Sequence, residues 1–282
     1  MRIGKYKLHT IESGFFALDG GAMFGIIPKP LWEKSNPADE KNRIKLATRN
    51  LLLKSDSKNI LIDTGMGSKW NEKFKEIYWI DQDDYSLEKS LMNINLLPKD
   101  ITDVILTHLH FDHTGGSTNA LDGKLMPAFP NALYHVSKKN FDWAVNPTDR
   151  DKGSYLKENF IPLKEAGVLC FTNTEKKFDD EIELIEVNGH TFGQQLVKIE
   201  DADNTILFCA DLFPTTAHIN LPYIMGYDLQ PLVTLGEKKE ILNMAAVKDW
   251  KLFFEHDPYC PAAVVERSEK GYKIKEKLKS ID

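Results

Sequence analysis

The sequence of 282 residues predicts an α/β fold, and three observations carry this prediction. A chain of this length with 42% hydrophobic residues can bury a large core, which excludes a disordered or fibrous protein. An apolar run over 60–63, an amphipathic segment over 86–97 and an apolar run over 104–106 give the order strand, helix, strand. Short strand-like runs then recur through the second half of the chain. This alternation is typical of layered α/β proteins, and we expect residues 1–282 to form one domain.

The N-terminal stretch over 3–18 alternates in hydrophobicity and predicts a strand. The glycine-rich stretch over 19–25 follows it. This stretch has two interpretations, a hairpin or a loop that brings Met23 and Phe24 to the rim of a pocket.

Two strands over 47–53 and 60–63 flank a polar turn, and the second strand ends in Asp63. A carboxylate at the end of a buried strand needs a partner. Asp63 therefore either accepts a hydrogen bond from a metal-bound imidazole or caps a helix.

The apolar residues between Ser86 and Leu97 recur at helical spacing, and Pro98 ends the predicted helix. A strand-like run over 129–138 comes later. The irregular stretch over 141–167 that follows is rich in aromatic and turn residues, and we expect it to form a lid or cap in which Trp143 lines a pocket.

The stretch over 107–116 contains three histidines and an aspartate within six residues, directly after the apolar run over 104–106. Side chains alternate along an extended segment, so His108 and His110 project to one side. Asp112 and His113 can turn to the other side once the chain bends. Imidazole and carboxylate groups suit divalent metals, and two such groups on one turn indicate two ions.

Three further potential ligands follow predicted strands. His190 follows the strand over 181–187, Asp211 follows a hairpin over 196–210, and His256 follows the strand over 250–255. If these strands lie in adjoining sheets, their ends converge.

The composition excludes several functions. A net charge of −6 argues against a nucleic-acid-binding surface. The chain begins without an apolar signal segment and contains no apolar stretch long enough to cross a membrane, so we expect a soluble, cytoplasmic protein that does not bind membranes. Three widely spaced cysteines predict free, buried thiols.

With these residues in this order, the chain resembles the metallo-β-lactamase superfamily. The resemblance implies a four-layer αβ/βα sandwich of two mixed sheets with helices outside. It also implies two divalent metal ions, zinc above all, with manganese, iron and cobalt as alternatives. The implied ligands are His108, His110 and His190 for one ion, Asp112, His113 and His256 for the other, and Asp211 as the bridge.

The stretches over 18–25 and 255–258 are similar to the branch of N-acyl-homoserine lactonases and methyl-parathion hydrolases. Lactonases of this branch often have a tyrosine three residues after the bridging aspartate, where this chain has Pro214. Three alternatives stay open: Tyr223 supplies that phenol, Tyr227 supplies it, or this chain lacks the role.

We therefore expect a hydrolase in which two ions roughly 3.5–4 Å apart share a hydroxide that opens a lactone or ester. Asp112 is expected to carry a proton to the leaving group, and His218 and Tyr223 to donate hydrogen bonds to the substrate. A structural role is the equal alternative for His218. Met23, Phe24 and Trp143 would form an apolar pocket that suits an N-acyl-homoserine lactone.

Two alternatives to lactone hydrolysis stay open. One is hydrolysis of an organophosphotriester on the same fold. The other is a metal-stabilised binding or sensor protein without activity. A homodimer is also expected, because apolar residues near the N-terminus are candidates for an interface.

Overall fold

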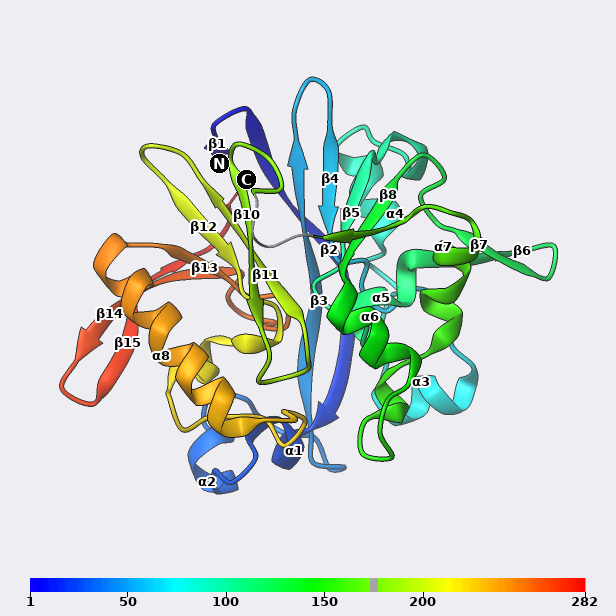
Figure 1. Ribbon diagram of the computed structural model, residues 1–282. Coiled ribbons are helices and arrows are strands. Elements are labelled where there is room, and N and C mark those ends of the chain that lie inside the picture. The colour runs from blue at the N-terminus through cyan, green and yellow to red at the C-terminus, as the bar shows by residue number, and fades with distance from the viewer. Residues whose placement is uncertain (173–176, 282) are drawn as a thin grey trace.

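A computed structural model describes residues 1–172 and 177–281, and two β-sheets form its centre (Figure 1). The first sheet has seven strands in the order β1-β2-β3-β4-β5-β8-β9, and the second has six in the order β10-β11-β12-β13-β14-β15. A separate hairpin, β6-β7, projects from the side of the molecule. The strands of the first sheet and the hairpin are β1 (Arg2–Ile3), β2 (Tyr6–Asp19), β3 (Arg43–Lys54), β4 (Asn59–Ile62), β5 (Asp103–Ile105), β6 (Thr118–Leu121), β7 (Lys124–Pro127), β8 (Leu133–Ser137) and β9 (Leu169–Thr172). The strands of the second sheet are β10 (Ile182–Val187), β11 (Gln194–Glu200), β12 (Thr205–Phe208), β13 (Lys251–Phe253), β14 (Ala262–Ser268) and β15 (Gly271–Leu278).

Helices cover the outer faces of both sheets. In Figure 1, α8 lies outside the second sheet, where it packs on β14, and α4 and α6 lie outside the first sheet, against β2 and β8. The α-helices are α1 (Gly20–Phe24), α2 (Lys29–Trp32), α3 (Glu72–Tyr78), α4 (Leu87–Asn93), α5 (Phe111–Thr114), α6 (Lys138–Val145), α7 (Ile161–Glu165) and α8 (Pro231–Lys248). The 3-10 helices are η1 (Pro98–Asp100), η2 (Gly115–Ser117), η3 (Lys152–Ser154), η4 (Lys157–Asn159), η5 (Ala210–Leu212) and η6 (Thr216–Ile219).

Alternation along the strands builds two separate cores. In β3, Leu51 and Leu53 point into the core between the two sheets, where Val197 and Phe208 of the second sheet also lie. Leu52, between them in the sequence, points the other way, into the core under the outer helices. The two mixed sheets with helices outside confirm the predicted four-layer α/β sandwich.

Local elements differ from the predictions mainly in length. The predicted helix over 86–97 ends earlier, as α4, and begins where the Ser86 hydroxyl accepts a hydrogen bond from the Lys89 amide. The stretch over 19–25 forms neither an open loop nor a hairpin. It contains the short helix α1, because the Asp19 carboxylate accepts a hydrogen bond from the Ala22 amide.

The carboxyl ends of parallel strands lie close together at one edge of the sandwich. β4 runs parallel to β5, with Ile62 opposite Ile105, and β12 runs parallel to β13. The amide of Gln195 donates to the Thr107 carbonyl (2.9 Å), which joins the edges of the two sheets. Segments that leave these strand ends therefore meet at one place.

The glycine pair after the histidine motif permits unusually close packing of two loops. A Cβ atom on Gly115 would lie 1.9 Å from the Met66 carbonyl oxygen, and one on Gly116 would lie 2.3 Å from the Thr64 carbonyl oxygen. Larger residues at either position would separate the loop after β5 from the loop after β4.

The cysteines form no disulfide. Cys209 and Cys260 are buried free thiols, as predicted, whereas Cys170 is only half-buried. Within residues 1–172 and 177–281, every helix is too short or too polar to cross a bilayer.

Candidate active site

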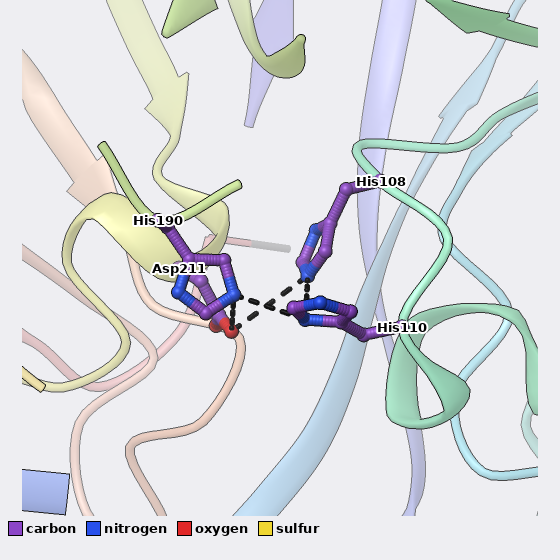
Figure 2. A group of neighbouring side chains, drawn as sticks. All are labelled: His108, His110, His190 and Asp211. Carbon is purple, nitrogen blue, oxygen red and sulfur yellow. Dashed lines mark hydrogen bonds and ion pairs between the residues drawn. The ribbon is translucent and has the colours of Figure 1, made fainter. Parts of the chain in front are cut away.

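The structure brings together all seven side chains that the sequence nominated as metal ligands. His108 and His110 lie on the loop after β5, and Asp112 and His113 lie on α5 directly behind it. His190 follows β10, Asp211 lies on η5 after β12, and His256 follows β13. Figure 2 shows His108, His110, His190 and Asp211 pointing toward one another.

The first cluster consists of His108, His110, His190 and Asp211. His110 Nδ1 lies 3.0 Å from both His108 Nε2 and His190 Nε2. Asp211 Oδ2 lies 3.1 Å from His190 Nε2 and 3.8 Å from His108 Nε2. The four side chains are buried and supply four potential ligand atoms to one point.

The second cluster consists of Asp112, His113 and His256. His113 Nε2 and His256 Nε2 are 3.2 Å apart. Asp112 Oδ2 lies 3.7 Å from His256 Nε2 and 3.9 Å from His113 Nε2. These three side chains are also buried.

Asp211 lies between the clusters and presents one oxygen to each. While Oδ2 faces His190, Oδ1 lies 3.2 Å from His256 Nε2. Oδ1 is buried and has no hydrogen-bond partner among the described residues. This is the placement that a carboxylate shared between two cations requires.

Hydrogen bonds fix the tautomers of two of the three histidines in the first cluster, His190 and His108. His190 Nδ1 donates to the Asp228 carboxylate (2.8 Å), which can only accept. The Thr107 hydroxyl donates to Asp63 (2.6 Å), so it accepts from His108 Nδ1 (3.1 Å). The Nε2 atoms of both rings therefore carry lone pairs toward the cluster.

The second cluster is oriented in the same way. His113 Nδ1 lies 3.0 Å from carboxylate oxygens of both Asp63 and Glu255. His256 Nδ1 donates to the Ala47 carbonyl (2.8 Å). Both Nε2 atoms are again left as lone-pair donors.

This pattern fits a pair of bound cations. The Nε2 lone pairs of His113 and His256 face each other at 3.2 Å, and three more imidazole nitrogens meet in the first cluster. Lone pairs at such distances repel unless a positive charge lies between them, which is a metal ion or, when no ion is bound, a proton on the ring. Imidazole nitrogen together with carboxylate oxygen is the donor set that borderline divalent metals take. The two clusters are thus suited to a dinuclear metal site.

The electrostatics of the clusters favour positive charge near Asp211. Burial opposes the imidazolium form, but hydrogen bonding and charge interactions with Asp211 outweigh it and raise the pKa of both His190 and His256 to about 9. Burial together with the neighbouring imidazoles His113 and His110 holds the pKa of His108 well below its usual range. The imidazoles of His113 and His190 overcome burial and hold the pKa of Asp211 well below its usual range.

The contacts of Asp63 agree with the first of its two predicted roles, a hydrogen bond to an imidazole of the site. Its carboxylate accepts hydrogen bonds from the Thr107 amide (2.7 Å) and the Thr107 hydroxyl, and it faces His113 Nδ1. Glu255 is the second carboxylate on the same imidazole. Both Glu255 oxygens lack hydrogen bonds to described residues, and burial and the Asp63 charge raise the pKa of Glu255 to about 8.

Two residues of the site have strained backbone conformations. Asp63 has φ 55° and Ala210, directly before Asp211, has φ 43°. Such positive φ values are unfavourable for residues other than glycine and cluster at functional sites.

A cavity of about 300 Å³ opens over the clusters. Five of the seven nominated residues line it, namely His110, Asp112, His190, Asp211 and His256. Its remaining lining is largely apolar and comes from several segments of the chain, with Leu18, Met23, Leu46, Phe111, Met225 and Leu229. Polar groups from Tyr78, Tyr227, Arg150, Asp151 and Ser154 complete the lining.

Of the three predicted pocket residues, only Met23 lines this cavity. Phe24 is fully buried behind it, where its ring stacks on Trp32 and on His218. The prediction for Phe24 is therefore wrong. Because α1 is helical, Met23 and Phe24 point in different directions, and only one of them can face the cavity.

Trp143 also lies outside the cavity lining. Its ring packs against Phe192, and its Nε1 donates to the Asp151 carboxylate (2.6 Å). Asp151 lines the cavity. Trp143 thus supports a cavity residue instead of forming the wall, which corrects the prediction.

His218 has no nitrogen available to a substrate. Its Nε2 donates to the Met23 carbonyl (2.9 Å), and its Nδ1 accepts from the Thr215 hydroxyl (2.8 Å). Burial lowers the pKa of His218 to about 3, so the ring is neutral. The structural alternative holds, and the catalytic prediction for His218 is wrong.

Tyr223 does not line the cavity either. It contacts the edge of the Phe24 ring. Tyr227, the second candidate for the phenol, does line the cavity, and burial raises its pKa. Tyr78 lines the cavity as well, and burial also raises its pKa.

Sequence reasoning missed several residues of the site. Asp228 comes from a loop far along the chain, and nothing in its local sequence marks it. Glu255 directly precedes His256 at a strand end, which is a usable signal. Arg150 and Asp151 lie within the predicted lid over 141–167, in a charged turn whose contacts the sequence does not show.

Comparisons with known proteins agree with this geometry. Residues 46–256 match the sequence model of the metallo-beta-lactamase superfamily. A probable metal-dependent hydrolase from Staphylococcus aureus is 32% identical, with a TM-score of 0.89, over 99% of this chain and 98% of that one. AidC, a dizinc quorum-quenching lactonase, is 22% identical with a TM-score of 0.82, over 99% of this chain and 96% of that one, and this likeness shows the shared fold.

A probable metallo-hydrolase of Methanocaldococcus jannaschii is 33% identical over 113 residues. That match covers 40% of this chain and only 39% of the relative. The family assignment therefore rests on the longer matches, and by them the chain belongs to the metallo-beta-lactamase superfamily, whose enzymes are hydrolases.

Proposed function

We propose that this chain is a dinuclear metal hydrolase that opens a lactone or an ester with an apolar acyl part, such as an N-acyl-homoserine lactone. The placement of Asp211 carries the proposal. Its two oxygens face two separate clusters of lone-pair donors on the floor of an apolar-walled cavity. AidC, which shares the fold, is a dizinc lactonase whose solved structure is a complex with its acyl-homoserine product.

Two groups of residues would each hold one metal ion. His108, His110 and His190 would hold one ion, Asp112, His113 and His256 the other, and Asp211 both. When bound, such a pair of divalent ions supplies a water of lowered pKa and a Lewis acid for the scissile oxygen. Zinc is the expected metal, with manganese, iron and cobalt as alternatives.

Asp112 is the acid–base group. It lines the cavity and lies beside both imidazoles of the second cluster. Hydrolysis adds water across the acyl C–O bond, so a proton must leave the attacking water and reach the departing alkoxide. We propose that Asp112 carries it.

Other groups bind and orient the substrate. Met23, Leu46 and Met225 give the acyl part an apolar wall, which favours a substrate with little charge near the scissile bond. Tyr227 and Tyr78 line the cavity, and we propose that one of their phenols donates a hydrogen bond to the substrate carbonyl. Tyr227 then replaces the tyrosine for which this chain has Pro214.

A substrate panel tests the proposal. The metal-loaded protein is characterised by elemental analysis and assayed with N-acyl-homoserine lactones, p-nitrophenyl esters, thioesters, phosphotriesters and phosphodiesters. We expect two ions per chain and the highest kcat/KM with a lactone or carboxylic ester. A chelator should abolish turnover, and added metal should restore it.

The same panel separates the alternatives. Preference for phosphotriesters would identify an organophosphotriester hydrolase. Two tightly bound ions without turnover of any substrate would identify a metal-stabilised binding or sensor protein. The direct opening of the cavity onto the clusters argues against the second alternative, because a purely structural site is closed.

A further inference from the structure

Among the described residues, the lining of the cavity includes one permanently charged basic side chain, Arg150, and no carboxylate forms an ion pair with it. Arg150 is the only lysine or arginine among the cavity-lining residues. It is exposed and lies in the stretch between α6 and η3, within the predicted lid over 141–167.

The position of Arg150 is fixed by backbone contacts. Its Nη2 donates to the Gly226 carbonyl (2.6 Å), and the Gly226 amide donates to the Ala22 carbonyl (2.8 Å). Ala22 directly precedes Met23, which lines the same cavity. The guanidinium is thus connected to the apolar wall through two hydrogen bonds.

The charge of Arg150 is not neutralised by a neighbouring carboxylate. No carboxylate oxygen of the described residues lies within 4.0 Å of its guanidinium. Asp149 pairs with Lys152 (2.8 Å). Asp151 accepts hydrogen bonds from Trp143 Nε1 (2.6 Å) and the Thr148 amide (2.8 Å).

The unused N–H donors of the Arg150 guanidinium indicate that it can bind a carboxylate. Only one N–H of Arg150 is used by Gly226, and a guanidinium has five in a planar fork that matches a carboxylate. The other carboxylates of the cavity, Asp112 and Asp211, are directed at the histidine clusters. The rim therefore offers an anion-binding group, while the wall between rim and floor is apolar.

We propose that Arg150 determines substrate specificity and that the preferred substrate is an ester or lactone with a carboxylate at the end of its apolar acyl part. The scissile bond lies over the clusters, the apolar part runs along the wall and the carboxylate meets Arg150. This inference rests on the proposed hydrolase function and narrows its substrate class.

Two esters of matched chain length test the inference. Mono-p-nitrophenyl adipate carries a terminal carboxylate, and p-nitrophenyl hexanoate does not. The metal-loaded wild-type enzyme, Arg150→Gln and Arg150→Lys are compared with both esters. Arg267→Gln, which removes an exposed arginine of β14 outside the cavity, is the matched control.

We expect Arg150→Gln to lower kcat/KM for the adipate ester roughly ten- to hundred-fold more than for the hexanoate ester, the range of a hydrogen bond to a charged group. The loss should appear mainly in KM. Arg150→Lys keeps the charge without the planar fork and should lie between wild type and Arg150→Gln. Arg267→Gln should leave the ratio between the two esters at the wild-type value.

Equal loss with both esters in Arg150→Gln would overturn the inference, because it would show that Arg150 only holds the rim in place. An unchanged ratio in both Arg150 variants would overturn it as well. Wild-type enzyme that hydrolyses neither ester while holding two ions would instead remove the proposed function, so the two failures are distinguishable.

Discussion

The two metal clusters share Asp211 but are supported by different parts of the fold. In the second cluster, the outer nitrogens of the histidines contact the ends of core strands, namely Asp63 after β4 and Ala47 within β3. In the first cluster, His190 contacts Asp228 on the loop before α8. His110 packs on Tyr155, which belongs to the stretch over 141–167, called the insertion below (ring centroids 4.6 Å apart).

The second cluster is held by the strands of the sandwich, whereas the first cluster is completed by segments at its periphery. Strands in a buried core open only with global unfolding, whereas loops open with less free energy. We therefore expect the second cluster to keep its shape whenever the protein is folded. The first cluster depends in addition on the loop before α8 and on the insertion.

The largest expected effect comes from the residue that both clusters share. Asp211→Ala should lose both ions, and kcat/KM should fall by at least about 10³-fold, because metal ions contribute several kcal/mol of transition-state stabilisation. Elemental analysis and steady-state kinetics measure the two losses. Asp142→Ala removes an exposed carboxylate from α6 and is the control. Two tightly held ions and full turnover in Asp211→Ala would refute the bridging role.

A matched pair of substitutions tests whether the two clusters are supported by different parts of the fold. Asp63→Asn and Asp228→Asn each replace a carboxylate that directly contacts a histidine, His113 and His190 respectively, and each should weaken the ion at that histidine roughly 10- to 100-fold. Asp63 also holds the Thr107 hydroxyl that contacts His108, so Asp63→Asn should weaken the ion of the first cluster as well, but by less. Only Asp63→Asn should also lower the free energy of unfolding, by about 1–3 kcal/mol, because Asp63 accepts buried hydrogen bonds from Thr107 as well.

Chelator competition gives the affinities, and anomalous diffraction assigns the retained ion to a cluster. Urea unfolding of the metal-free proteins gives the stabilities. If the two variants lose the same unfolding free energy, the distinction between a core cluster and a peripheral cluster is wrong.

The smallest expected effect concerns the insertion. Tyr155→Phe removes the hydrogen bond between the phenol and the Thr191 hydroxyl (2.6 Å) and should cost about 1 kcal/mol of unfolding free energy. The affinity of the first cluster should fall by less than in Asp228→Asn, since the ring contact with His110 remains.

The same variant has a pH signature. Burial raises the pKa of Tyr155 above its unfolded value of about 10, so the unfolded chain loses its proton first and stability falls as the pH rises above about 10. Below pH 10 both states are protonated and the phenol causes no pH dependence. Tyr155→Phe should reduce the slope of unfolding free energy against pH above pH 10, and Tyr259→Phe, at an exposed position, should not.

The layers of the fold and the positions of the candidate ligands could be predicted from the sequence because both follow from local patterns. Hydrophobic alternation marks the strands, and His108, Asp211 and His256 each lie within two residues of the end of an apolar run. Residues at the carboxyl ends of parallel strands gather at one edge, so their convergence followed from the fold.

The cavity wall could not be predicted in the same way. Whether Met23 or Phe24 faces the cavity depends on the helical turn of α1, and the role of His218 depends on its contact with the Met23 carbonyl. Arg150 and Tyr227 reach the cavity from separate loops, whose relative placement is a property of the tertiary structure. The lid role of 141–167, the homodimer and the cytoplasmic location stay predictions.

The packing of Gly115 and Gly116 on the loop after β4 limits which residues the two loops can carry at their contact. The contact is between main chains, at Thr64 and Met66, so no change of side chain on one loop can make room for a Cβ on the other. Main-chain packing therefore restricts both positions to glycine, whereas this contact places no such restriction on the side chains that line the cavity.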